Sequence, residues 1–165
     1  MLQPKPAERM PGFTYVTILI DRIGLKDAHT YVAPYFSIKV RDFTGRDVCP
    51  EQNTPTCNLI KDKYLIFNMN VHLQKALEEM PQDFAIFFEL MHFKSKKDKV
   101  SCRCFAIVER DEIKSGIGTF ELYKKPPDYN RRRLYLFTEK PLFLHLTFTL
   151  ETHKGEKETT TVEKL

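Results

Sequence analysis

Apolar and polar residues alternate in two runs near the start of the chain, 15–20 and 35–40. In both runs the even-numbered positions are apolar: Val16, Ile18, Ile20, Phe36, Ile38 and Val40. A period of two residues is the pattern of a β-strand with one buried face. The loop between them, 21–34, is too long for a tight hairpin, and loops of this length usually carry function. The pattern therefore predicts two strands joined by a functional loop.

Apolar or alternating runs also predict strands at 64–71, 83–93, 104–108, 118–123, 134–137 and 142–150. The run at 83–93 is nearly continuously apolar, with Glu89 as its lone interior charge, as expected of a central strand. Residues 41–63 contain a glycine and two prolines and predict an irregular crossing, although parts of it such as 56–60 could form a strand. These spacings predict an all-β fold, an antiparallel eight-stranded β-sandwich.

One segment has the period of a helix instead. Leu73, Ala76, Leu77 and Met80 are spaced as on one face of an α-helix, and Pro81 ends the run. We expect a short helix in a connection, with its apolar stripe on the sandwich, because about two turns are too few to anchor in a membrane.

The length of 165 residues suits one domain. Residues 1–12 contain three prolines and no periodicity, so we expect a leader or linker there, a domain over 13–150, and a polar, disordered tail over 151–165. With 13 Phe and 7 Tyr against 6 Gly, the composition favours β-structure. The sequence contains neither a membrane-spanning apolar run nor the apolar core of a secretory signal, so we expect a cytoplasmic location.

The chemistry-bearing residues form no catalytic motif. The four cysteines lack the density of a disulfide framework and the paired spacing of a zinc site, so free thiols are expected. No nucleophile elbow, phosphate-binding loop or metalloprotease motif is present, and the five histidines are scattered. His145 alternates within a strand pattern and is expected on a sheet face. We expect no enzyme activity and no required cofactor.

Positive charge is concentrated in two segments. The chain carries a net charge of +4, whereas 94–103 and 124–133 each hold five basic residues and one acidic residue. The rest of the chain is therefore net negative. A local excess of this kind attracts phosphate-bearing partners.

The predicted sandwich and several motifs resemble a known family. These motifs are YVTILI, GLKD and VAPYFSIKV near the start, then FAIFFELMHFKSKK, CFAIVERDEI, FELYKKPPDYNRRRL and KPLFLHL. Together they resemble the C2 domain of the axin interactor, dorsalization-associated protein (Aida) family. The resemblance implies a lipid-binding module of about eight strands, preceded in the parent protein by a helical region. It also implies a role in axin-linked and stress-kinase (JNK) signalling and an axin-like protein partner.

Calcium binding is where the sequence departs from the C2 pattern. A C2 calcium site gathers carboxylates on two opposed loops, since Ca²⁺ takes 6 to 8 oxygen ligands. Asp27 matches one ligand position, but Ala33 stands where another carboxylate is expected, and His92 and Lys94 replace a pair on the opposed loop. A cation there opposes Ca²⁺. At most a weak calcium site at Asp21 and Asp27 is expected.

The basic segments are the better candidates for ligand binding. The first candidate site for acidic phospholipid, either phosphoinositide or phosphatidylserine, comprises Lys94, Lys96, Lys97, Lys99 and Arg103. A second basic patch would comprise Lys61, Lys63, Lys124, Lys125, Arg131, Arg132 and Arg133 if the fold brings them together. Both segments could instead keep the loops soluble or dock a protein.

Three functions follow from these observations. The first is a membrane-targeting module that binds acidic lipid mainly without Ca²⁺ and associates peripherally with membranes. The alternative is a protein-interaction domain of a scaffold, which binds axin or a similar partner through a sheet face. Nucleic-acid binding is the weakest, because the Phe residues follow core alternation and form no exposed stacking ladder.

Overall fold

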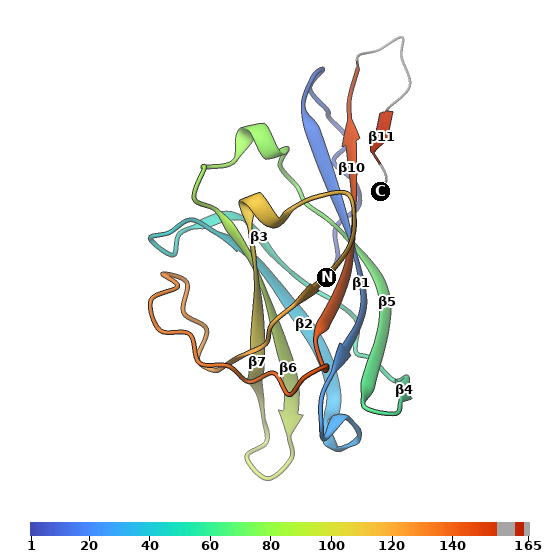
Figure 1. Cartoon of the computed structure of the whole chain (residues 1–165), viewed down its shortest axis with the longest axis vertical. Coiled ribbons are helices and arrows are strands. Elements are labelled where there is room, and N and C mark those ends of the chain that lie inside the picture. Colours follow the sequence, from blue (N-terminus) through green and yellow to red (C-terminus); the bar gives the residue numbers. More distant parts are fainter. Residues whose placement is uncertain (155–160, 164–165) are drawn as a thin grey trace.

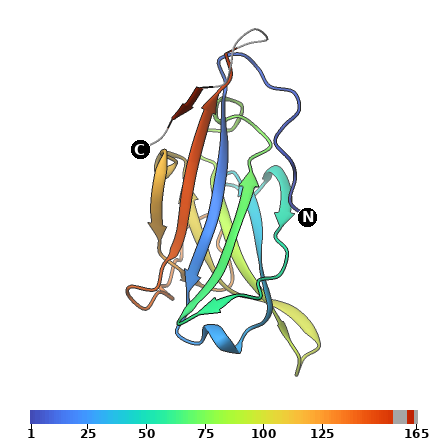
Figure 2. The same cartoon turned by 90° about the vertical axis from the view of Figure 1, so that its right-hand side faces the viewer.

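The computed structural model describes residues 1–154 and 161–163, which form a two-layered antiparallel β-sandwich (Figures 1 and 2). The first sheet has the order β11-β10-β1-β5-β4, and β8 also pairs with β10. Its strands are β1 (Thr14–Gly24), β4 (Ile60–Lys61), β5 (Tyr64–His72), β8 (Gly116–Phe120), β10 (Leu144–Thr152) and β11 (Thr161–Glu163). Because β8 and β11 pair with successive parts of β10, they share one edge of this six-stranded sheet.

The second sheet has five strands in the order β3-β2-β6-β7-β9. These strands are β2 (Val32–Arg41), β3 (Asp47–Asn53), β6 (Ala85–Lys94), β7 (Lys99–Glu109) and β9 (Tyr123–Lys124). Three 3₁₀ helices lie in connections: η1 (Ala28–Thr30), η2 (Leu77–Glu79) and η3 (Arg110–Glu112). The predicted all-β sandwich is confirmed.

The core lies between the sheets, where the predicted alternation holds. Val16, Ile18 and Ile20 of β1 face Phe36 and its neighbours on β2, and all are buried. Phe36, Phe84 and Phe88 of this core and Phe87 and Phe105 of a second, smaller cluster are the largest fully buried side chains. Burying aromatic side chains is a major favourable term in folding.

Several predicted elements differ in the structure. The loop 21–34 is shorter than predicted, because β1 continues to Gly24 through a register shift after Ile20 and β2 begins at Val32. The predicted helix is wrong: only the three residues of η2 are helical. The apolar stripe nevertheless packs as expected, with Leu73, Ala76 and Met80 buried.

Polar and proline-containing segments account for most other differences. Residues 47–53 were expected to be irregular, but they form β3. Pro50 is tolerated there because β3 is an edge strand, where a missing N–H donor does not interrupt the sheet. Of the segment 56–60, for which a strand was considered, Ile60 alone lies in a strand, the two-residue β4. The predicted strand 134–137 contributes one isolated bridge, Tyr123 to Leu136. Disorder was wrongly predicted for Glu151 and Thr152, which end β10, and for β11; residues 155–160 and 164–165 lie outside the described part of the chain.

The N-terminal leader lies against the sandwich. The Gln3 amide donates to Gln52 at 2.9 Å, and Gln74 Nε2 donates to the Pro4 carbonyl at 2.9 Å. Lys5 and Arg9 both pair with Glu151 at the end of β10. Glu151 belongs to β10 through its pairing with Tyr15 of β1, and these ion pairs hold the leader against the end of that strand.

Candidate functional site

The lysine-rich hairpin between β6 and β7 projects from the lower end of the molecule, beside the β1–β2 loop (Figures 1 and 2). Lys96, Lys97 and Lys99 are exposed, and Lys94 is half-buried at the strand end. The nearby ammonium of Lys125 lowers the pKa of Lys94, which brings one lysine of the second basic segment into this group. We name Lys94, Lys96, Lys97, Lys99 and Lys125 the basic end.

Arg103 lies behind the hairpin and is held by aromatic and acidic neighbours. Its Nε donates to the Tyr31 hydroxyl at 2.8 Å, and that hydroxyl donates to Asp27 Oδ1 at 2.7 Å. The guanidinium also lies over the Phe137 ring, 4.6 Å from its centroid. Burial, followed by the hydrogen bond to Asp27, raises the pKa of Tyr31, so this phenol stays protonated at neutral pH.

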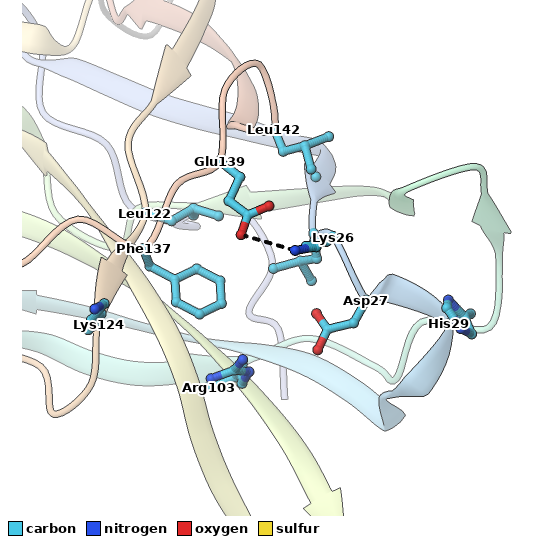
Figure 3. Close-up of a pocket in the computed structure, with 11 residues that line it drawn as sticks. Lys26, Asp27, His29, Arg103, Leu122, Lys124, Phe137, Glu139 and Leu142 are labelled. Atoms are coloured by element: carbon cyan, nitrogen blue, oxygen red, sulfur yellow. Dashed lines mark ion pairs between the residues drawn. The ribbon is translucent and has the colours of Figure 1, made fainter.

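A pocket of about 500 Å³ opens beside this cluster (Figure 3). Its walls are apolar at Leu25, Leu122, Phe137 and Leu142, whereas its rim is charged. On the rim, Lys26 pairs with Glu139 at 3.9 Å, and Arg103 and Lys124 line the space together with the carboxylate of Asp27. The arrangement suits a ligand with an anionic group and an apolar part.

His92 lies close to this cluster and is buried. Its ring packs edge-on against Tyr31 with centroids 5.1 Å apart. Burial, together with the cations Lys94 and Arg103, lowers the pKa of His92. At neutral pH this ring is therefore uncharged and carries no negative charge that could bind a calcium ion.

The two weak metal candidates have different partners. Asp21 pairs with Arg22 at 3.0 Å, whereas Asp27 accepts the Tyr31 hydrogen bond. Among the described residues, no group of three or more His, Cys, Asp or Glu side chains is arranged to hold a metal ion. The same part of the chain contains no helix long and apolar enough to cross a membrane.

The second basic patch does not form as one surface, which corrects the sequence-based prediction. Lys61 and Lys63 flank the turn between β4 and β5, at the edge of the six-stranded sheet opposite β8. Lys124 and Lys125 lie at β9, on the side where β7 contacts β8, so the width of the sandwich separates the two pairs.

The three arginines lie apart from both lysine pairs. Arg131 Nε pairs with Glu109 at 2.9 Å, and the Asp83 carbonyl accepts from its Nη2. The backbone amides of Arg132 and Arg133 both donate to Asp128, and these hydrogen bonds lower the pKa of that carboxyl. All three arginines lie in the segment 123–137, which crosses the outside of the five-stranded sheet.

That segment, 123–137, covers the outer face of the five-stranded sheet (Figure 1). Tyr129 donates to Glu89 Oε2 at 2.7 Å, and Lys39 Nζ binds Glu89 Oε1 at 2.9 Å. The rings of Phe87 and Tyr129 pack edge-on with centroids 4.9 Å apart. We call this the covered face.

Over most of its outer face the six-stranded sheet has no such cover. The N-terminal leader covers one end, where Arg9 lies over the Tyr15 ring and the Met10 amide donates to the Tyr15 hydroxyl, and in Figure 2 no described segment crosses in front of the rest of β10, β1 and β5. The side chains of this outer face alternate with the core positions and form cross-strand rows, one of which runs Ile117, Thr147, Leu19, Asn70. We name as the open face the residues Thr17, Leu19, Asn70, His72, Ile117, Thr119, His145, Thr147 and Thr149. None of these side chains is Asp, Glu, Lys or Arg.

Charged side chains lie at the two ends of the open face. At one end Arg22, which pairs with Asp21, lies cross-strand from His145, and at the other end Glu151 pairs with Lys5 and Arg9. Burial lowers the pKa of both His72 and His145, so the two imidazoles within the face are neutral at pH 7. His145 thus lies on a sheet face as predicted.

Sequence reasoning missed the open face as a candidate site. The only available signal was the polar half of each alternation, such as Thr147 and Thr149 in LFLHLTFTL. That signal is weak, because Thr and Leu are ordinary residues for the solvent side of a strand.

The chain was also compared with known proteins. A family model described as "Axin interactor dorsalisation-associated protein, C-terminal" matches residues 3–148. Proteins named "Axin interactor, dorsalization-associated protein" from Macaca fascicularis, Danio rerio and Homo sapiens are each 47% identical over 150 residues, or 91% of this chain. The match covers 54%, 49% and 48% of these relatives, so the chain spans about half their length.

Proposed function

Because the chain belongs to the axin interactor, dorsalisation-associated protein family, we propose that it is a non-catalytic protein-interaction domain of an axin-linked signalling protein. In this proposal the open face contacts axin or a similar partner. The relatives are named for an interaction with axin, and the shared half of their sequence is the β-sandwich described above.

The observation that carries this proposal is the uncharged open face. The centre of a protein interface is depleted in charged residues, because each buried charge must be paired or lose its hydration. Strand faces that only contact water have no such restriction. On the open face the charges lie only at the two ends, while Ile117 in the central row is 79% exposed.

The proposal is tested by measuring the affinity of the purified chain for an axin fragment. The double variant Leu19→Lys, Thr147→Lys places two cations in the central row, and we expect binding to weaken at least about thirtyfold, because unpaired charges would be buried. Lys96→Gln, Lys97→Gln at the basic end is the matched control and should bind like wild type. Circular dichroism melting verifies that both variants are folded.

Two results would contradict the proposal. One is a folded Leu19→Lys, Thr147→Lys variant with unchanged affinity, and the other is a wild-type chain that binds no axin fragment.

A second candidate function, binding of acidic phospholipid, is favoured by the basic end. The hairpin carries four lysines, Lys125 lies near Lys94 at its base, and Arg103 of the strand that follows the hairpin lines the pocket. Each basic residue near an anionic leaflet contributes about 1 kcal/mol, enough together for reversible attachment. The chain would then associate peripherally with the cytoplasmic side of a membrane, without a required metal ion.

Liposome co-sedimentation tests this second function. Binding should rise with phosphatidylserine or phosphoinositide content, fall with salt, and be the same with and without Ca²⁺. Changing Lys94, Lys96, Lys97 and Lys99 to Gln should weaken binding at least about tenfold. The Leu19→Lys, Thr147→Lys variant should sediment like wild type. A calcium requirement, or full binding by the four-Gln variant, would contradict this function.

A further inference from the structure

β8 is an edge strand with one long side unpaired. It pairs with β10 from Phe120–Leu144 to Gly116–Phe148. Among residues 1–154 and 161–163, no strand pairs along its other side (Figure 2). Alternate backbone N–H and C=O groups of an edge strand point away from the sheet and can pair with an added strand.

The sequence of β8 leaves this edge unprotected. Protein edges are usually blocked by lysine, proline or a bulge, and GIGTF contains neither of those residues, with an unbroken register against β10. The exposed Ile117 lies between two glycines, so little side-chain bulk shields the backbone on either side of it. A Cβ on Gly118 would come within 3.0 Å of the Phe120 ring, so that glycine also has a packing reason.

An acidic pocket of about 180 Å³ adjoins this edge. Glu112 and Glu121 supply its carboxylates, together with Glu109, which already pairs with Arg131 at 2.9 Å, while Ile107, Phe120 and Leu134 supply apolar wall. Oε2 of Glu121 is buried and has no hydrogen-bond partner in the described part of the chain. A Lys or Arg side chain combines an apolar stem with a cationic head and so matches both parts of this pocket.

We propose that the β8 edge binds an extended segment of a protein partner by strand addition, with a Lys or Arg of that segment seated in the acidic pocket. The inference rests on the proposed protein-interaction function and specifies the chemistry of the partner. A second copy of this chain does not fit, because pairing two β8 edges would bring two acidic pockets together.

The test uses short synthetic peptides and NMR of the whole chain. The probe peptide alternates Val and Thr around one central Lys. We expect it to shift the amide resonances of 116–120, whereas a peptide with Glu in place of that Lys should bind at least about tenfold more weakly. Two further peptides carry N-methyl groups on the odd-numbered or on the even-numbered residues. One of them should lose binding and the other should keep it, because an added strand pairs through the N–H groups of one edge.

A variant pair checks the protein side. Glu121→Gln should weaken binding of the Lys peptide about threefold and should not weaken binding of the Glu peptide. The control, Asp62→Asn, removes an exposed carboxylate at the opposite edge of the same sheet and should change nothing. Equal binding of the Lys and Glu peptides, resonance shifts outside the β8 region, or wild-type dimerisation through β8 would overturn the inference.

The failure of this inference is distinguishable from failure of the proposed function. If an axin fragment binds wild type and Glu121→Gln equally but not Leu19→Lys, Thr147→Lys, the edge inference is wrong and the open-face proposal stands. If no axin fragment binds while the Lys peptide still shifts 116–120, the edge inference survives and axin is the wrong partner.

Discussion

The outer faces of the two sheets differ in whether a segment of the chain packs over them. On the five-stranded sheet, the segment 123–137 covers Phe87 and Phe105 and places Tyr129 against the Glu89–Lys39 pair. On the six-stranded sheet, the open face has no covering segment in the described chain. Sequence explains the difference: β6 is apolar on both faces, whereas β1 and β10 alternate. A strand that is apolar on both sides requires a cover, and an alternating strand leaves a face for other molecules.

The covered face should behave energetically as a second core. Phe87 is fully buried against Tyr129, so Phe87→Ala should lower the free energy of unfolding by about 3 to 4 kcal/mol. The matched change on the open face, Ile117→Ala, should alter it by less than about 0.5 kcal/mol. Urea denaturation measures both, and similar losses in the two variants would contradict the distinction between the faces.

The Glu89 carboxylate should be nearly as important as the aromatic packing. Burial opposes the charged form of Lys39, but hydrogen bonds to Glu89 and Tyr129 outweigh it and raise the pKa of Lys39. Glu89→Ala leaves this partly buried cation with the more distant Glu51 carboxylate, 3.8 Å away, as its partner and should cost about 3 kcal/mol. Tyr129→Phe removes one hydrogen bond to a charged group and should cost about 1.5 kcal/mol. An Ala variant as stable as wild type would show that the pair does not hold the cover in place.

Acidification should affect the open face through its two histidines. Because burial lowers the pKa of His72 and His145, the unfolded chain binds protons more readily, and stability should fall as pH drops below about 6.5. The variant His72→Gln, His145→Gln should lose part of this slope, with the remainder attributable to His92. Melting temperatures between about pH 7.5 and 5.5 test this, and a wild-type melting temperature that rises on acidification would contradict it.

Alternation was sufficient to predict the fold because it depends on local chemistry. The runs at 15–20 and 35–40 predicted both the strands and their buried sides. The helix prediction failed because Leu73, Ala76 and Met80 reach the core from an extended connection with a single 3₁₀ turn. Helical spacing over so few residues does not distinguish these backbones.

The candidate sites depend on contacts between distant segments, which one sequence does not specify. The four hairpin lysines lie in one loop because they fall within the short segment 94–99. The path of the segment 123–137 decides where the other basic residues lie. It places Lys125 near Lys94 of the hairpin and Arg131 beside Glu109, away from the hairpin. The open face and the β8 edge were not predicted as particular surfaces. Whether a sheet face or edge is exposed depends on which distant segments pack against it in the fold.

The most direct test of the contrast between the faces is a cross-saturation NMR footprint of the chain bound to an axin fragment. Amides of β1, β5, β8 and β10 around Leu19 and Thr147 should lose intensity. Those around Tyr129 on the covered face and Lys97 at the basic end should keep it. A footprint centred on the 123–137 segment or on the basic end would contradict the account.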